Sequence, residues 1–313
     1  MAGCPWQPFS LKERPKMYKR ARLIYNPTAG REQIRKALPF ILDKLEMAGY
    51  ETSAYATQGV GDAGQAARLA CQRGHDLIVV AGGDGTLNEV INGLAEANYR
   101  PQVGLIPAGT TNVLARELGI PRDFETACEV IIQGEPTPLD VIKVNGQYFI
   151  GVAGGGTLTE LTYEVPSRLK TVLGQLAYYV KGIEKLAALQ PTKMTIVSEE
   201  GRIDEEIMLF LVANSGSLAG FEKLAPQARL DDGYMDVLVV RNVSMPEFIK
   251  LLMKVPRGEH VHDPHVTYFQ TKSLTVSAES QVWLNLDGEK RGMLPATFTV
   301  LPRHVLVRTP HGK

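Results

Sequence analysis

The sequence has no excess of charge of either sign. Its 313 residues include 34 lysines plus arginines and 34 aspartates plus glutamates, so the formal net charge at pH 7 is zero. A protein that binds nucleic acid needs a basic footprint, and the overall composition supplies none. We therefore expect no nucleic acid among the partners. The hydrophobic content of 44% is ample for globular cores.

Cysteine is scarce. Cys4, Cys71 and Cys128 are odd in number and widely spaced along the chain. This pattern excludes a complete disulfide framework and a zinc site of the Cys-x-x-Cys type. A reducing compartment fits best, so we expect a cytoplasmic protein.

Long hydrophobic runs are absent too. The longest apolar stretches, such as residues 207–213, are far shorter than the roughly 20 residues of a spanning helix, so we expect no transmembrane segment. Residues 1–16 are polar and lack a hydrophobic core upstream of Cys4, which supports neither a signal peptide nor a lipoprotein anchor. We expect residues 1–16 to be a disordered extension, and both Met1 and Met17 are candidate natural starts.

Residues 76–94 are the most informative segment. The apolar, β-branched run 77–81 is typical of a strand buried on both faces of a parallel sheet. Gly82, Gly83 and Gly85 follow, and without Cβ atoms they let backbone N–H groups approach phosphate oxygens. An amphipathic helix then starts at the same place and aims its N-terminus at the turn. The segment therefore predicts a phosphate site.

Asp84 lies inside this glycine turn. Its carboxylate would repel phosphate unless a cation or a transferable proton mediates, so it indicates catalysis, and a kinase in particular. The alternative is a glycine-rich turn with a solvated aspartate. The turn fits neither G-x-x-x-x-G-K-[ST] nor G-x-G-x-x-G, which disfavours the P-loop and dinucleotide-binding interpretations.

The first half of the chain alternates between strands and helices. We expect strands at 21–25, 52–57, 76–81 and 103–106, with helices at 34–45, 61–74, 86–97 and 112–118. This order predicts an α/β domain over 17–138 with a mostly parallel sheet, in which ligands bind beyond the carboxyl ends of the strands. The segments 26–30, 82–86 and 107–112 follow strands, and their convergence predicts a nucleotide pocket. Alone, 107–112 would be read as an ordinary turn with a helix cap.

After about residue 138 the pattern changes to short alternating strands, which predicts an antiparallel β-sandwich over 139–300. The strands are expected at 139–144, 147–153, 194–198, 206–213, 235–240, 273–278, 282–286 and 297–300. One helix is expected over 168–189, with its lysines mostly solvated. The acidic segment 230–234, taken alone, is equally consistent with a turn in which Asp and Gly serve only the backbone, whereas 287–289, taken alone, favours an ordinary hairpin turn. Neither spacing establishes a metal site.

Five motifs together resemble those of the bacterial soluble diacylglycerol kinase family, within the lipid-kinase superfamily that includes sphingosine kinases. They occur in the family's order across roughly residues 17–308. They are Asn26-Pro27-Thr28-Ala29-Gly30, Gly82-Gly83-Asp84-Gly85-Thr86-Leu87-Asn88-Glu89, Phe221-Glu222-Lys223-Leu224, Leu230-Asp231-Asp232-Gly233-Tyr234 and Asp287-Gly288-Glu289.

The resemblance implies an ATP- and Mg2+-dependent kinase that phosphorylates the hydroxyl of diacylglycerol and yields phosphatidic acid. It also implies a cleft between the α/β domain and a lipid-substrate sandwich domain. The tail 301–313 is then expected to return to the first domain. The implied partners are a membrane lipid at the bilayer surface, reached from the cytoplasm by a peripheral enzyme, and a second copy of the chain in a homodimer.

The resemblance also assigns residues. It implies Glu289 as the base, Asp84 as the organiser of the phosphates and Lys181 as a lysine associated with activity. It implies a structural Mg2+ held by Asp232 and the carbonyls of Arg229 and Tyr234. The implied nucleotide-binding residues are Asn26, Pro27, Thr28, Ala29, Gly30, Thr57, Gly83, Asp84, Gly85, Thr86, Leu87, Asn88, Glu89 and Thr110.

Val113 departs from the family pattern. The family commonly has Gly-Thr-x-Asn-Asp, whereas this chain has Gly109-Thr110-Thr111-Asn112-Val113. This leaves the acceptor open between diacylglycerol, a sphingoid base and monoacylglycerol. Two further alternatives are an NAD kinase, which the sandwich motifs oppose, and a catalytically silent binding protein, which Asp84 and Glu289 together oppose.

Overall fold

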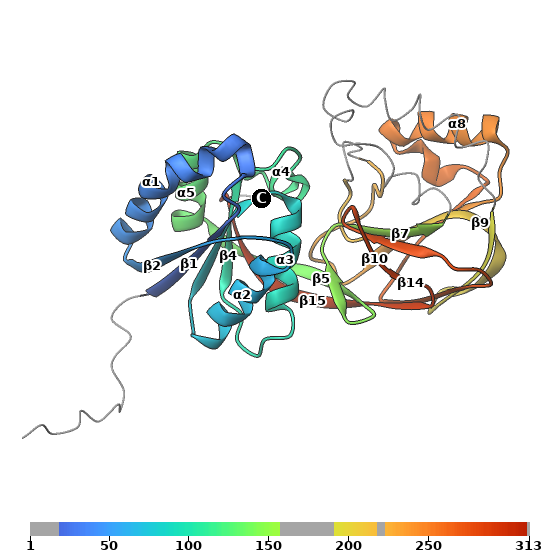
Figure 1. The fold of residues 1–313 in the computed structure, drawn as a ribbon. Helices are drawn as coiled ribbons and strands as arrows, with labels where there is room; N and C mark the ends of the chain where they lie inside the picture. The colour runs from blue at the N-terminus through green and yellow to red at the C-terminus, as the bar shows by residue number, and fades with distance from the viewer. Residues whose placement is uncertain (1–18, 157–190, 218–222, 312–313) are drawn as a thin grey trace, which may run out of the picture.

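The computed structural model of the chain describes residues 19–156, 191–217 and 223–311 (Figure 1). It has an N-terminal α/β part with parallel strands and a C-terminal antiparallel β-sandwich part, which confirms the predicted fold class. The helix expected over 168–189, and Lys181 with it, lies outside the described residues.

The N-terminal sheet follows the order β2-β1-β3-β4, and all of these neighbours run parallel. Its strands are β1 (Lys19–Tyr25), β2 (Tyr50–Ala56), β3 (Leu77–Gly82) and β4 (Gln102–Pro107). Every residue of β3 is buried, as expected for the central strand of a sheet covered on both faces.

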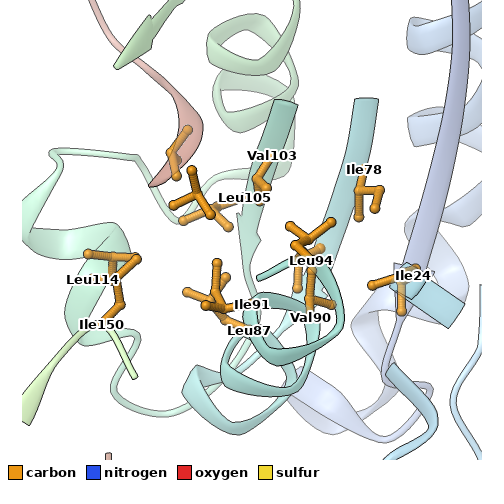
Figure 2. Close-up of a cluster of buried hydrophobic side chains, with 14 of the residues drawn as sticks. Ile24, Ile78, Leu87, Val90, Ile91, Leu94, Val103, Leu105, Leu114 and Ile150 are labelled. Atoms are coloured by element: carbon orange, nitrogen blue, oxygen red, sulfur yellow. The ribbon is translucent and has the colours of Figure 1, made fainter. Parts of the chain in front are cut away.

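Helices cover both faces of this sheet. They are α1 (Gln33–Met47), α2 (Asp62–Gln72), α3 (Asp84–Leu94), α4 (Val113–Glu117) and α5 (Phe124–Gln133), and η1 (Ala29–Glu32) precedes α1. Helices α1 and α5 pack on one face, where Leu23 points, and α2, α3 and α4 pack on the other, where Ile24 points. Figure 2 shows the second face, on which Leu87, Ile91 and Leu94 of α3 lie against the sheet.

The C-terminal part consists of antiparallel strands around a separate core. They are β5 (Glu135–Val144), β6 (Gln147–Phe149), β7 (Val152–Gly156), β8 (Thr192–Ser198), β9 (Gly201–Ala213), β10 (Met235–Arg241), β11 (Val266–Thr271), β12 (Ser273–Ala278), β13 (Trp283–Leu286) and β14 (Glu289–Met293). Phe149, Phe210 and Phe298 meet edge to face in this core, with centroid separations of 6.4 and 6.3 Å. Helix α8 (Met245–Lys254) and the short helices η2 (Val255–Arg257) and η3 (Glu259–His262) lie outside it.

Strand β15 (Ala296–Thr309) belongs to both parts. Its first half pairs with β12, and its second half runs parallel to β4 through Val307 and Val103. It pairs with β5 along most of its length, and the two strands connect the two parts in Figure 1. A strand of 14 residues spans about 45 Å, enough to pass through both cores.

Two element predictions need correction. The strand expected over 147–153 is broken into β6 and β7, because the backbone at Ile150 and Gly151 turns to donate hydrogen bonds to Asp287. The strand expected over 297–300 continues to Thr309 because it finds a second partner in β4. Helices α5 and α8 and strands β11 and β14 were not predicted.

Candidate active site

The glycine turn after β3 lies against the loop that follows β4. A Cβ on Gly109 would lie 2.5 Å from the Cα of Gly83, so the two backbones touch and only glycine fits at position 109. A Cβ on Gly82 would lie 2.7 Å from Thr86 Oγ1. The segments 82–86 and 107–112, predicted to converge, therefore pack directly on each other.

The segment 26–30 joins the same edge of the sheet. The Asn26 N–H donates to the Ala81 carbonyl at 3.0 Å, and Asn26 Oδ1 accepts from the Thr28 N–H at 3.0 Å. Gly30 has φ of +59°, and a Cβ there would approach the Ala108 carbonyl oxygen to 3.2 Å. The Thr57 N–H donates to the Tyr25 carbonyl at 2.9 Å. The carboxyl ends of four parallel strands thus bring most of the predicted nucleotide-binding residues together.

Asp84 is fixed by the loop after β4. Its Oδ1 accepts from the Val113 N–H at 2.7 Å. Beside it, Asn112 takes the left-handed conformation with φ of +50°, and its Nδ2 donates to the Gly82 carbonyl at 3.0 Å. Arg122 holds the same loop from outside by donating to the carbonyls of Thr110 and Thr111 at 2.6 and 3.1 Å. Position 113, where the chain leaves the family pattern, is therefore in direct contact with Asp84.

Glu89 has a structural contact that the sequence did not indicate. Its two carboxylate oxygens accept from the N–H groups of Gly61 and Ala63 at 2.8 and 3.0 Å. These N–H groups are at the start of α2, where a carboxylate is favoured by the unpaired donors and the helix dipole. Glu89 therefore orders the loop 57–61, which follows β2 at the same edge of the sheet.

Glu289 reaches this edge from the other part of the molecule. It is the first residue of β14, after the turn formed by Asp287 and Gly288, which have φ of +48° and +91°. Its Oε1 lies 3.4 Å from the position that a Cβ would take on Gly85. Its Oε2 accepts from the Arg291 guanidinium, with Nε at 2.7 Å. The structure thus places Glu289 opposite the start of α3.

Asp287 is a residue of this candidate site to which sequence reasoning gave no role. Its carboxylate accepts from Asn88 Nδ2 at 2.8 Å and from the N–H groups of Ile150, Gly151 and Val152 at 3.3, 3.1 and 2.9 Å. Desolvation raises the pKa of Asp287, and the hydrogen bonds from Asn88 and from this backbone oppose that rise. The available signal was its place in Asp287-Gly288-Glu289, but its partners are distant in sequence.

A cavity of about 190 Å³ lies between α3, α4 and the β6–β7 connection. The polar residues that line it are Asp84, Asn88, Thr111, Ser215, Ser217 and Asp287, with Gly288 beside them. The rest of the wall is mainly apolar and includes Leu87, Ile91, Val113, Leu114, Ile150 and Val152. Figure 2 shows Leu114 and Ile150 together, facing Leu87 and Ile91.

The predicted magnesium turn, 229–234, is tied to β5. The N–H groups of Gly233 and Arg303 donate to the fully buried Asp140 at 2.6 and 2.7 Å. Asp232 Oδ1 accepts from the Tyr234 N–H at 3.0 Å. Within the described residues no cluster of three or more His, Cys, Asp or Glu side chains is placed to hold a metal. A site here would rest on one carboxylate, backbone carbonyls and water, an all-oxygen set that suits Mg2+.

The fold and the site define a class of proteins in which an α/β domain is followed by a β-sandwich domain. Residues 20–144 match the diacylglycerol kinase catalytic domain, and residues 160–309 match the YegS C-terminal NAD kinase beta sandwich-like domain.

Curated relatives cover nearly the whole chain. A diacylglycerol kinase of Bacillus subtilis (strain 168) is 52% identical over 94% of this chain and 98% of its own length. One from Staphylococcus saprophyticus is 46% identical over 94% and 97%. The crystal structure of a diacylglycerol kinase from Bacillus anthracis str. Sterne superimposes with a TM-score of 0.79 at 28% identity, covering 94% of this chain and 98% of that one. The chain belongs to the bacterial diacylglycerol kinase family, which confirms the resemblance read from its motifs.

Proposed function

We propose that this protein is a lipid kinase that transfers the γ-phosphoryl group of ATP to the free hydroxyl of diacylglycerol and forms phosphatidic acid. The observation that carries the proposal is the position of Glu289, whose carboxylate faces Gly85 at the start of α3. A potential base and a glycine turn suited to phosphate thus meet at one point, although they come from different parts of the chain. Family membership supports the same conclusion.

The chemistry needs little beyond positioning and charge stabilisation. The acceptor oxygen attacks the γ-phosphorus, the bond from that phosphorus to the bridging oxygen breaks, and ADP leaves with the electron pair. Glu289 accepts the hydroxyl proton, and the Arg291 guanidinium orients its carboxylate for this task. When bound with ATP, Mg2+ would neutralise the negative charge on the phosphates.

The nucleotide would lie along the carboxyl edge of β1, β3 and β4. The N–H groups of Gly83, Gly85 and Thr86 at the start of α3 are suited to hold the phosphates. Asp84, held by the Val113 N–H, would face the phosphates through Mg2+. The segment 26–30, Thr57 and Thr110 complete the wall, and Glu89 acts through the loop 57–61 that it orders.

Three further parts of the proposal rest mainly on the family. A structural Mg2+ would be held by Asp232 and the carbonyls of Arg229 and Tyr234, and Lys181 would support activity. The enzyme is a cytoplasmic homodimer that works at the membrane surface, because diacylglycerol resides in the bilayer. No helix among the described residues has the length and apolar character needed to span a membrane.

An NAD kinase is the alternative closest in chemistry, since the second domain match carries that name. The cavity beside the base opposes it. A dinucleotide acceptor would bring polar ribose and charged phosphate groups against Leu87, Ile91, Val113 and Ile150, which offer them no side-chain partners.

The test is incubation of the purified protein with γ-labelled ATP, Mg2+ and a panel of acceptors: diacylglycerol, sphingosine, monoacylglycerol, phosphatidylglycerol and NAD. We expect label in diacylglycerol. Glu289→Gln and Asp84→Asn should each lower kcat by about 10²–10⁴-fold with an unchanged circular-dichroism spectrum. The exposed Glu199 provides a matched control, since Glu199→Gln should behave as wild type. Label in NAD or sphingosine alone, or a Glu289→Gln variant with normal kcat, would refute the assignment.

A further inference from the structure

The cavity beside Glu289 is small, and its wall has an apolar side and a polar side. Its volume is about 190 Å³, whereas pockets that enclose a drug-sized ligand measure about 300–1,000 Å³. Six apolar side chains contribute to its wall, and they come from α3, α4, the β6–β7 connection and the start of β7. The carboxylates of Asp84 and Asp287 and the side-chain amide of Asn88 lie on its polar side. The part of a ligand that enters the cavity must therefore be small and must carry both polar and apolar groups.

The cavity lies next to the reacting groups. Asp84, which lines it, is the first residue of α3, and Gly288, which also lines it, directly precedes Glu289. Glu289 Oε1 in turn approaches Gly85. A hydroxyl that enters from the cavity therefore arrives between the base and the glycine turn.

We propose that this cavity holds the glycerol end of diacylglycerol with its free hydroxyl and the first carbons of its chains, while the rest of both acyl chains stays outside the protein. This inference rests on the proposed function. Two long acyl chains exceed the volume available. The apolar wall gains from contact with the ester-flanking carbons, whereas a polar sugar or phosphate would lose hydrogen bonds there.

Val113 is the specificity-determining residue of this cavity. Its N–H holds Asp84, and its half-buried side chain forms part of the apolar wall. One residue therefore fixes a carboxylate at the phosphate site with its backbone and selects an apolar acceptor with its side chain. A pocket of this size contacts only the hydroxyl end of the acceptor, so the activity does not depend on acyl-chain length.

The variant that tests the cavity is Val113→Phe, which fills it. Ser217→Leu is a second filling variant at a half-buried position that also lines the cavity, for use if the first does not fold. Val197→Phe makes the same chemical change as the first variant at an exposed position on β8 and serves as the control. Equilibrium binding of radiolabelled dioctanoylglycerol without ATP is measured for each protein. The acceptor kcat/KM and the KM for ATP are then measured in mixed micelles at fixed surface concentration.

We expect wild type and Val197→Phe to bind dioctanoylglycerol equally, and the filling variants to bind it about tenfold or more weakly. Acceptor kcat/KM should fall by the same factor while the KM for ATP stays constant. For wild type, kcat/KM should change by less than about threefold between acyl chains of six and eighteen carbons. Filling variants that bind as wild type, a wild type that does not bind, or a steep dependence on chain length would overturn the inference.

These outcomes distinguish a failure of the cavity inference from a failure of the proposed function. A wild type that binds dioctanoylglycerol in the cavity, as judged by the filling variants, yet phosphorylates no diacylglycerol would refute the proposed function alone. Phosphorylation that is indifferent to both filling variants would refute the cavity inference alone.

Discussion

Asn88 donates a hydrogen bond of 2.8 Å to Asp287 and thereby joins the helix of the glycine turn to the hairpin that carries Glu289. Asn88 is one turn along α3 from Asp84, and Asp287 is two residues before Glu289. The three backbone N–H groups of residues 150–152 hold the same carboxylate. Asp287 therefore sets the position of Glu289 relative to the glycine turn.

Asp287→Ala should lower both stability and kcat. Removing the carboxylate leaves Asn88 and the N–H groups of 150–152 without their acceptor, which costs about 1–3 kcal/mol of unfolding free energy. Glu289 also loses its fixed position, so kcat should fall by about tenfold or more while the KM for ATP changes little. Denaturant unfolding and steady-state kinetics check both effects. An Asp287→Ala protein with wild-type kcat would show that Glu289 is positioned by other contacts.

Gly151→Ala should disturb the hydrogen bonds that hold Asp287. A Cβ on Gly151 would lie 2.5 Å from Asp287 Oδ1, so either the Asp287 carboxylate leaves its hydrogen bonds or the β6–β7 connection moves. Forced repacking of this kind costs about 1–3 kcal/mol. Gly59→Ala is the matched control, because a Cβ there meets nothing within 4 Å, and its unfolding free energy should stay within about 0.5 kcal/mol of wild type. In a double-mutant cycle with Asp287→Ala, the losses of unfolding free energy from the two substitutions should not be additive. Strict additivity would contradict the clash between Gly151→Ala and Asp287.

The turn 229–234, proposed to bind Mg2+, gives a separate prediction. Asp232→Ala should lower the melting temperature in the presence of Mg2+ and remove the shift that EDTA causes in wild type, because the backbone carbonyls alone bind the ion poorly. Asp231→Ala, one residue away and paired with Arg229 at 3.4 Å, is the control and should keep the EDTA-dependent shift. A wild-type protein whose melting is the same with and without EDTA would rule out a structural ion there.

Asp263 supplies a prediction about pH. Hydrogen bonds from Lys254 and from the His265 N–H lower the pKa of Asp263 from its ordinary 3.8 to about 2. A lowered pKa in the folded state means that the stabilisation is present above about pH 4 and is lost as the pH falls toward 2. Asp263→Asn should therefore cost about 1–2 kcal/mol at pH 7, with the lower end reflecting the exposure of Lys254. The exposed Asp43 offers the control substitution Asp43→Asn. A difference from wild type that stays constant between pH 7 and pH 2 would contradict the ion pair.

Local pattern was enough to predict the α/β half. The apolar run 77–81 became β3 almost residue for residue, because a strand buried on both faces leaves a continuous signal. Helix α5 was missed although Asp123 caps it by accepting from the Thr126 N–H at 2.9 Å, a short-range signal present in the sequence. Strand β14 was missed because Glu289–Met293 shows no apolar alternation and forms only by pairing with β13.

Contacts between distant residues could not be predicted from pattern. The motif resemblance gave Glu289 and Asp84 their roles, but no periodicity indicated that Asp287 would bind Asn88 and the backbone of Gly151. The same holds for Glu89, whose carboxylate caps α2, and for Asp140, which holds the turn at Gly233. The contact between Asp287 and Asn88 depends on how β5 and β15 bring the two parts together, whereas the Glu89 and Asp140 contacts depend on the packing within each part, and both are properties of the whole fold.

Val113→Asp tests why the chain departs from its family's pattern at this position. The Val113 N–H already holds Asp84 at 2.7 Å, and the side chain lines the cavity with Leu87 and Leu114. A carboxylate there would face Asp84 and apolar groups without a partner, so we expect the acceptor kcat/KM to fall by about tenfold or more, with no rescue by added Mg2+. Val113→Asn, which is polar but uncharged, should lose less, and that difference isolates the charge. Rates are measured with diacylglycerol, sphingosine and monoacylglycerol. An increase in the diacylglycerol rate on Val113→Asp, or a lower Mg2+ requirement, would show instead that the carboxylate completes a metal network and that valine weakens an ordinary enzyme.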